Sequence, residues 1–545
     1  MPLHARERCC WRLRTYKRLM VEAYTWKFLI LLAVVQCFIN GIVYMAINDT
    51  IFPLFKYLGV EGAHLQLLST FAMAPWSLKP ILGILSDTIT LGRYHKRYWM
   101  VFACICGFTG CVVLSTGVLE IASLVAMFFL VNFQVSFCDL LIEGQFAEIM
   151  TLYPATSSNI VTLKTICQQF GYIIALSFVG PLADTKQFTP IYIIALCFSV
   201  TPVLLLLVGF MPEKRIYHAK RFVDIHMQKI RDNKRLVVIT IAIGLCGPLA
   251  SLWIVLNPIP TNPELNRGLG MGLTLVVIIV GVLGAYYTFP RVVAHVVLYQ
   301  VITSLGTVPV GTALDFFYTA NAECLPGGPA FPYAYYITLT GTLSIFVGFL
   351  AAFLYQGVFS GWRFRNIILL TTALKALAGL FDLAMVRRWN IDLGIPDKVF
   401  YIVGEAILEK AITVLLWIPS STIIGKVCTP GMEATTYAYL AGMSNLASTL
   451  ASLLGASAID WAGLQMQTSP CTWDNLWVLV LVGHIICHLV VGLPSAFLIP
   501  NTYQNESLDI PQKQEEEEEE EEEGQQGSVI LSEFSSEYVE VNNLE

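Results

Sequence analysis

Long apolar segments alternate with short polar loops along most of the chain. A helix of about 20 apolar residues is long enough to cross a lipid bilayer. Six such segments come first, at residues 27–49, 65–85, 98–119, 121–143, 159–182 and 189–211. After a polar stretch, a pair follows at 237–257 and 270–289, and six more lie at 296–318, 336–356, 366–386, 400–421, 434–457 and 475–498. The pattern predicts an all-α polytopic membrane protein with two six-helix bundles and an inserted helix pair, about fourteen transmembrane helices in all.

The spacing of these segments divides the chain into six predicted regions. They are a basic arm (1–26), a first bundle (27–211), a basic linker (212–236), the inserted pair (237–289), a second bundle (290–499) and an acidic tail (500–545). The arm, the loop after the second segment and the linker all carry Lys and Arg, which favour the cytoplasmic side. With an even number of helices, both termini are expected in the cytoplasm. The arm leads into an apolar run without a small-residue cleavage site, so we expect no removable signal peptide.

The composition is typical of an integral membrane protein. Hydrophobic residues make up 56% of the chain and charged residues only 13%, and the mean hydropathy is +0.65. The net charge of -6 says little about partners, because the glutamate run Glu515–Glu523 alone exceeds it. We expect no nucleic-acid surface, a monomer, and a disordered tail that is either solvated and dispensable or binds a basic partner.

Most of the fourteen cysteines lie inside apolar runs, where cysteine is a small packing residue. Cys324 and Cys471 fall in loops on the side opposite the linker. They would form one extracellular disulfide or remain two free thiols, and the sequence leaves both open.

Ionisable residues inside apolar segments are the candidates for function, because each costs about 2.5 to 3.5 kcal/mol to insert and normally faces a cavity or a partner. Asp139 and Glu143 are four residues apart and share one helical face, as do Lys164 and Gln168. With Lys79 they are predicted to form a polar cluster in the first bundle. Such a cluster can bind a substrate, carry a proton, or only lock helices together.

The second half carries corresponding residues, as a binding site between two bundles requires. These are Asp315, Lys375, Asp382, Glu405 and Glu409. We assign substrate binding to Asp139, Glu143, Lys164, Gln168, Lys79 and Lys375, and proton coupling to Asp139, Glu143 and Glu405. His484 and His488 have a spacing that can bind a metal, but no third ligand is near, so we expect no metal and no cofactor.

We do not expect the chain to use ATP hydrolysis, because it has no phosphate-binding GxxxxGK loop followed by Ser or Thr. A transporter of this kind runs on a gradient.

The loop after the second segment is the candidate gate. Its Gly83, Ser86, Asp87, Gly92, Arg93, Lys96 and Arg97 follow the order of the loop between the second and third helices of major facilitator transporters. Asp87, Arg93 and Arg97 would hold a neighbouring helix in one state and release it in the other. The plainer interpretation is a set of positive charges that only fixes the loop on the cytoplasmic side.

Four stretches carry a more specific resemblance. They are APWSLKPILGILSD (74–87), SFCDLLIEGQFAE (136–148), IDLGIPDKVFYIVGEAIL (391–408) and CTPGMEATTYAYLAGMSN (428–445). Their order resembles the folate-biopterin transporter family of the major facilitator superfamily, most of all its kinetoplastid members. The resemblance implies proton-coupled uptake of a pterin or folate across the plasma membrane.

That substrate class suits the candidate residues. A carboxylate such as Asp139 accepts the paired donors of a pterin ring, and lysines pair with the carboxylates of folate. Trp76, Phe146 and Tyr172 are candidates for stacking on a flat heterocycle. The alternatives are the same fold carrying another metabolite such as S-adenosylmethionine, and a membrane enzyme or non-transporting sensor; missing nucleophile, metal and phosphate motifs argue against the enzyme.

Overall fold

The computed structural model describes residues 20–117, 120–152, 157–213, 215, 222–232, 234–235, 237–245, 263–426, 433–467 and 471–504. Within these residues, eleven helices are long and apolar enough to cross a membrane. The basic arm up to residue 19, parts of the linker and the tail from residue 505 lie outside the described residues, and the predictions made for them stay predictions.

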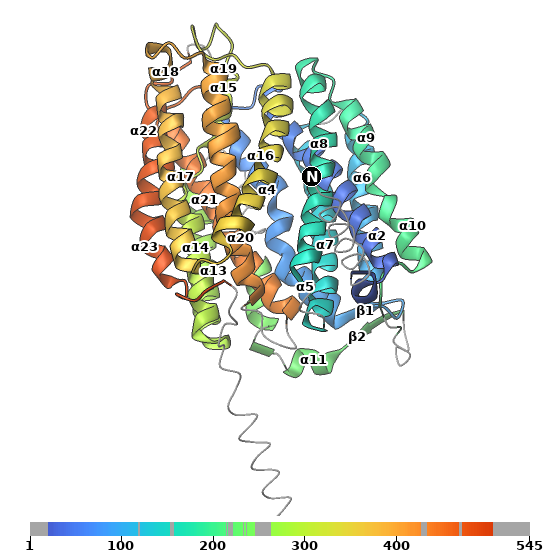
Figure 1. Ribbon diagram of the computed structural model, residues 1–545. Helices are drawn as coiled ribbons and strands as arrows, with labels where there is room; N and C mark the ends of the chain where they lie inside the picture. Colours follow the sequence, from blue (N-terminus) through green and yellow to red (C-terminus); the bar gives the residue numbers. More distant parts are fainter. Residues whose placement is uncertain are drawn as a thin grey trace, which may run out of the picture. The chain divides into compact units, whose positions relative to one another are not determined.

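Six membrane-length helices make up the first half, shown from blue to green in Figure 1. Their segments are α2 (Trp26–Val34), η1 (Val35–Val43) and α3 (Tyr44–Tyr57); α4 (Gly62–Ala72), η2 (Ala74–Leu78) and α5 (Lys79–Thr88); α6 (Arg97–Leu114); α7 (Ile121–Leu152); α8 (Ser157–Asp184); and α9 (Thr189–Ser199) with α10 (Thr201–Val208). Each predicted segment of the first bundle overlaps one of these helices, but the predicted end of the first segment, at residue 49, is wrong, because α3 continues to Tyr57. The predicted end of the fourth segment is wrong, because α7 continues from residue 143 to Leu152.

The second half follows a helix at 237–245 and α13 (Pro263–Thr288). Its segments are α14 (Arg291–Gly306) and α15 (Gly311–Tyr318); η4 (Ala334–Leu339), α16 (Thr340–Leu354) and η5 (Tyr355–Phe359); α17 (Phe364–Val386); α18 (Trp389–Asp392); α19 (Asp397–Tyr401), η6 (Ile402–Glu409) and α20 (Lys410–Lys426); α21 (Glu433–Trp461); and α22 (Leu476–Val480), η7 (Leu481–Ile486), η8 (His488–Gly492), α23 (Leu493–Ser495) and η9 (Ala496–Leu498). The predicted start of the second inserted segment, at residue 270, is too late, because α13 already starts at Pro263, a residue that suits the first helical turn.

Several of these spans are π-helical in part. The π-helical segments are η1, η4, η5, η6, η7 and η8. A π-helical turn inserts an extra residue into the helix, and such turns occur often at functional sites. Here η1 carries Gln36 and Asn40, and η6, η7 and η8 carry Glu405, His484 and His488.

The two ends of the helical bundle have different features. At one end, β1 (Ile89–Leu91) pairs antiparallel with β2 (Val223–Ile225), which α11 (Met227–Asp232) follows (Figure 1). We call this the sheet end. At the other end, Cys324 and Cys471 form a disulfide with a Cα–Cα distance of 5.3 Å, which resolves the alternative that the sequence left open. We call this the disulfide end.

Two seams join the halves. The α4, η2 and α5 segments pack against α21, and α8 packs against η4. At the first seam a Cβ on Gly442 would lie only 2.0 Å from Pro80 Cγ. The halves therefore approach each other closely where the second helix of the chain meets α21.

Candidate functional site

The predicted polar residues of the first half meet in one buried group. Lys79 Nζ lies 2.8 Å from Asp139 Oδ2 and 3.4 Å from Glu143 Oε2. Lys164 Nζ lies 3.0 Å from Asp139 Oδ1 and also pairs with Glu143. We call Lys79, Asp139, Glu143 and Lys164 the charged cluster. Each acid contacts both bases, so the negative and positive charges balance.

Local structure explains how three helices deliver these side chains. Asp139 and Glu143 lie one turn apart on α7, and Lys164 extends from α8. Lys79 starts α5, directly after the 3-10 segment η2. Only 4% of Lys79 and 5% of Asp139 is exposed. Buried charges of this kind are tolerated when they are paired and hydrogen-bonded.

Two amides that the sequence analysis missed complete the surroundings of Asp139. Asn40 Nδ2 donates to Asp139 Oδ1 at 2.8 Å, and Gln36 Nε2 donates to the same oxygen at 3.3 Å. Both lie on the π-helical segment η1. The signal in the sequence was present, since two amides four residues apart interrupt an apolar run.

An aromatic wall adjoins the charged cluster. Lys79 Nζ lies 4.6 Å from the centre of the Trp76 ring. The Trp76 ring lies edge-on to Tyr44 at 5.7 Å, and Tyr44 lies 6.1 Å from Tyr172. Gln168 Nε2 donates to the Tyr172 hydroxyl at 2.8 Å. Gln168, Trp76 and Tyr172 thus belong to this wall as predicted neighbours of the cluster, whereas Phe146 is buried in the hydrophobic core.

Some polar atoms beside the cluster have unused hydrogen-bonding capacity. Within the described residues, Trp76 Nε1 and Asn40 Oδ1 are buried without a hydrogen-bond partner. Buried polar atoms are normally satisfied, so each exception needs an explanation. A donor and an acceptor left free beside a charged cluster can bind the polar groups of a ligand.

The second half reaches the cluster through α21. The Tyr437 hydroxyl donates to Glu143 Oε1 at 3.2 Å, and Asn445 Nδ2 donates to the Trp76 carbonyl at 2.8 Å. The cluster therefore lies at the seam between the halves. The other predicted residues lie elsewhere: Lys375 pairs with Glu409 at 3.1 Å within the second half, and Glu405 lies in η6 on the same span as Glu409.

The loop of the candidate gate contacts Glu213, which follows the last helix of the first half. Glu213 accepts hydrogen bonds from the backbone N–H groups of Lys96 at 2.6 Å and Arg97 at 3.0 Å, and so caps α6. Burial raises the pKa of the Glu213 carboxyl, against the opposing effect of these two residues. The Arg97 guanidinium lies over the Tyr94 ring at 4.4 Å, Arg93 has a φ of 72°, and Asp87 lies in the last turn of α5. Glu213 was not a candidate from the sequence.

Further contacts join the halves at the disulfide end. Asp184 Oδ1 and Oδ2 accept from the backbone N–H groups of Tyr333 at 2.6 Å and Ala334 at 2.7 Å. Asp184 ends α8, so its carboxylate caps the first turn of η4 in the other half. Lys56 Nζ also donates to the Thr319 carbonyl at 2.8 Å. Neither Asp184 nor Lys56 was a sequence candidate.

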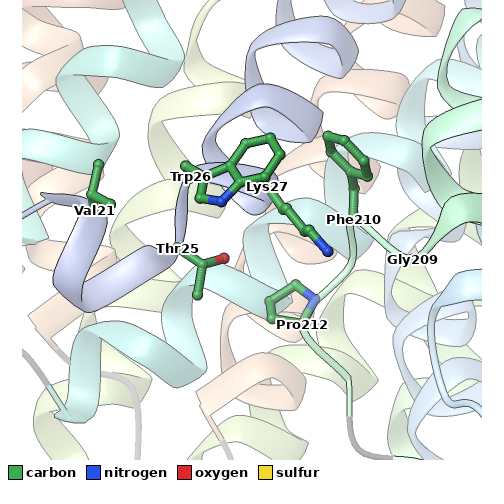
Figure 2. A pocket seen from close by; sticks show the side chains of 7 residues that line it. All are labelled: Val21, Thr25, Trp26, Lys27, Gly209, Phe210 and Pro212. Atoms are coloured by element: carbon green, nitrogen blue, oxygen red, sulfur yellow. The ribbon is translucent and has the colours of Figure 1, made fainter.

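A separate surface pocket of about 450 Å³ opens beside the start of α2 (Figure 2). Trp26, Lys27 and Phe210 line it, and the Trp26 and Phe210 rings meet edge-on at 5.6 Å. Its lining contains no member of the charged cluster.

Residues 40–519 match the BT1 family. The chain is 22% identical over 462 residues to the probable folate-biopterin transporter 6 of Arabidopsis thaliana, covering 84% of this chain and 80% of the relative. It is 22% identical over 491 residues to the folate-biopterin transporter of Synechocystis, covering 89% and 84%. It is 21% identical to folate transporter 1 of Plasmodium falciparum, covering 82% and 75%.

Solved structures with a similar fold are transporters too. A POT family transporter in complex with 5-aminolevulinic acid matches with a TM-score of 0.63 and 12% identity, covering 87% of this chain and 96% of that one. An auto-inhibited POT family peptide transporter matches at 0.60 and 13% identity, covering 89% and 99%. The nucleoside transporter NupG matches at 0.52 and 13% identity, covering 87% and 98%. The predicted major facilitator architecture is confirmed at the level of the fold.

Proposed function

The chain belongs to the BT1 family, and on that premise we propose that it is a secondary active transporter that imports folate, biopterin or both across the plasma membrane. Relatives named as folate-biopterin transporters support this substrate class. The observation that carries the proposal for this chain is the charged cluster, which is buried at the seam between the halves and adjoins free hydrogen-bonding atoms.

The chemistry of the cluster suits a pterin. Adjacent ring N–H and amino groups of a pterin make paired hydrogen bonds to a carboxylate such as Asp139 or Glu143. The unpartnered Trp76 Nε1 and Asn40 Oδ1 supply one donor and one acceptor for the remaining ring atoms. The aromatic wall of Tyr44, Trp76 and Tyr172 offers faces on which a flat heterocycle stacks. The carboxylates of folate would replace Asp139 and Glu143 as ion-pair partners of Lys79 and Lys164.

Transport by alternating access requires that the two ends open in turn. We place the disulfide end outside, where disulfides form, and the sheet end with the basic linker in the cytoplasm, with both termini on that side. Asp184 and Lys56 would close the outer end in the present conformation. Asp87, Arg93 and Arg97 would act at the cytoplasmic end, and a proton gradient would drive uptake by the monomer.

Replacing Asp184 with alanine should loosen the outer end. Two hydrogen bonds to a charged acceptor disappear, and each is worth about 1.5 to 3 kcal/mol. We expect amide hydrogen exchange of peptides covering residues 333–339 to become at least tenfold faster. The matched control is Glu323→Ala, which removes an exposed acid at the same end. Unchanged exchange in the Asp184 variant would contradict a closing role.

An uptake panel tests the substrate class. We expect cells that lack their own carriers to gain saturable uptake of labelled folate or biopterin when they express the full chain, and more of it when the outside is acidic. Uptake of S-adenosylmethionine alone would favour the alternative cargo. Saturable uptake of neither pterin compound would end the proposal, and binding in detergent without flux in proteoliposomes would indicate a sensor.

A further inference from the structure

A second group of titratable side chains lies within the second half, apart from the charged cluster. His484 Nδ1 lies 2.7 Å from Asp382 Oδ2, which joins η7 to α17. The other oxygen of Asp382 accepts from the Tyr318 hydroxyl at 3.2 Å. An imidazole that faces a carboxylate at this distance can take up a proton and form a charge-assisted hydrogen bond.

A second imidazole lies one turn further along the same span. His488 is 8% exposed, and neither of its ring nitrogens has a side-chain hydrogen-bond partner among the described residues; the backbone of Gly483 and His484 lies nearest to the ring. Lys375 and His484 are its electrostatic neighbours. Burial and these two neighbours, which are or become cationic, disfavour a positive charge on His488, so His484 is the imidazole of the pair that is suited to take up a proton.

Carboxyl groups outnumber permanent cations around this pair, unlike in the charged cluster. Glu405 has Asp382, Glu409, Asp315 and Lys375 as electrostatic neighbours. His484 faces Asp382, Glu409 and Lys375. The Tyr336 hydroxyl donates to Asp315, which also faces Asp49 and Lys56. Lys375 is already paired with Glu409 at 3.1 Å.

The balance of carboxyl groups and lysines therefore differs between the two halves. Unpaired negative charge inside a membrane protein is costly, and proton uptake is the usual way to remove it. The charged cluster has a lysine for each acid, so it suits a charged or polar substrate. The acids of the second half have too few lysines and therefore need protons.

The backbone that carries these titratable side chains is irregular. Glu405, His484 and His488 lie on the π-helical segments η6, η7 and η8. Both η6 and η7 pack against α17, which carries Asp382 and Lys375. Three irregular segments thus place titratable side chains around one regular helix.

We propose that His484 with Asp382, together with Glu405, forms the binding site for the transported proton. The proposal rests on the transport function and adds the site of coupling to it. A proton from water binds the imidazole of His484 or the carboxylate of Glu405, and Asp382 remains ionised to stabilise the imidazolium. Asp139 and Glu143, which the sequence also nominated for coupling, then serve substrate binding, since each already contacts two lysines.

The test uses the purified full chain in proteoliposomes with labelled folate and biopterin. Accumulation is measured with the outside one pH unit more acidic, and counterflow exchange is measured with equal pH on both sides. One pH unit can drive about tenfold accumulation for one proton per substrate. We expect His484→Gln and Glu405→Gln to reduce accumulation to equilibration, while counterflow stays within about twofold of the unmodified chain.

Matched controls and opposite outcomes make the test decisive. His295→Gln removes a histidine that contacts Tyr286 outside this group, and Glu323→Gln removes an exposed acid; both should keep full accumulation. Variants of His484 and Glu405 that still accumulate substrate, or that lose counterflow equally, would overturn the proton site. Exchange without any response to pH in the unmodified chain would overturn it and leave the transport function standing, whereas absence of exchange would overturn both.

Discussion

Replacing Asp139 with asparagine is expected to reduce substrate binding and transport by at least a hundredfold. Asp139 contacts Lys79, Lys164, Asn40 and Gln36, and only 5% of it is exposed. Without its charge, two buried lysines share only Glu143. Removing one partner from a buried ion pair costs about 3–5 kcal/mol, and about 2.7 kcal/mol already corresponds to a hundredfold in affinity. The measurements are the dissociation constant for folate or biopterin and the rate of counterflow.

A second substitution separates lost binding from lost folding. Lys79→Met in the Asp139→Asn background removes one positive charge and restores the balance of the cluster. We expect this double variant to recover thermal stability while binding stays lost, because the carboxylate acceptor is still missing. The control Asp392→Asn changes an exposed aspartate and should behave like the unmodified chain. Binding by Asp139→Asn within threefold of normal would remove Asp139 from the site.

The membrane helices were predictable because the bilayer imposes a length and a polarity on every span. The charged cluster was predictable for a related reason, since few ionisable residues are tolerated there and Asp139 and Glu143 show helical spacing. What the spacing could not give is the partner of each residue. Gln36 and Asn40 lie 103 and 99 residues before Asp139 in the sequence. A local pattern cannot predict a contact over such a separation.

The remaining misses share this origin. Asp184 caps a helix start 149 residues later in the chain, and Glu213 caps one 116 residues earlier. The spacing of His484 and His488 gave no role to either residue, because the carboxylate partner of His484, Asp382, lies 102 residues away on α17. Irregular π-helical segments add to the difficulty, because they shift the facing of side chains that a regular helix would predict. Local periodicity thus identifies the candidates, whereas tertiary packing pairs them.

Replacing Gly171 with alanine is expected to destabilise the whole first half. A Cβ at this position would lie 2.1 Å from the Cys37 carbonyl oxygen and 2.7 Å from Gly41 Cα. Both are backbone atoms, so α8 and η1 must move apart to admit one methyl group. Overpacking typically costs about 1–3 kcal/mol, and a backbone obstacle places this case at the upper end. Thermal unfolding in detergent measures the loss.

The same substitution connects packing to function, because η1 also carries Gln36 and Asn40. If η1 shifts away from α8, the two amides lose their geometry at Asp139, and substrate affinity should fall even at temperatures where the variant remains folded. Gly272→Ala is the control with the opposite sign: nothing lies within 4 Å of its added Cβ, and alanine favours a helix interior by about 1 kcal/mol. A Gly171→Ala variant that melts and binds like the unmodified chain would mean that these helices do not cross at Gly41 and Gly171. The arrangement of amides around Asp139 would then lose its structural basis.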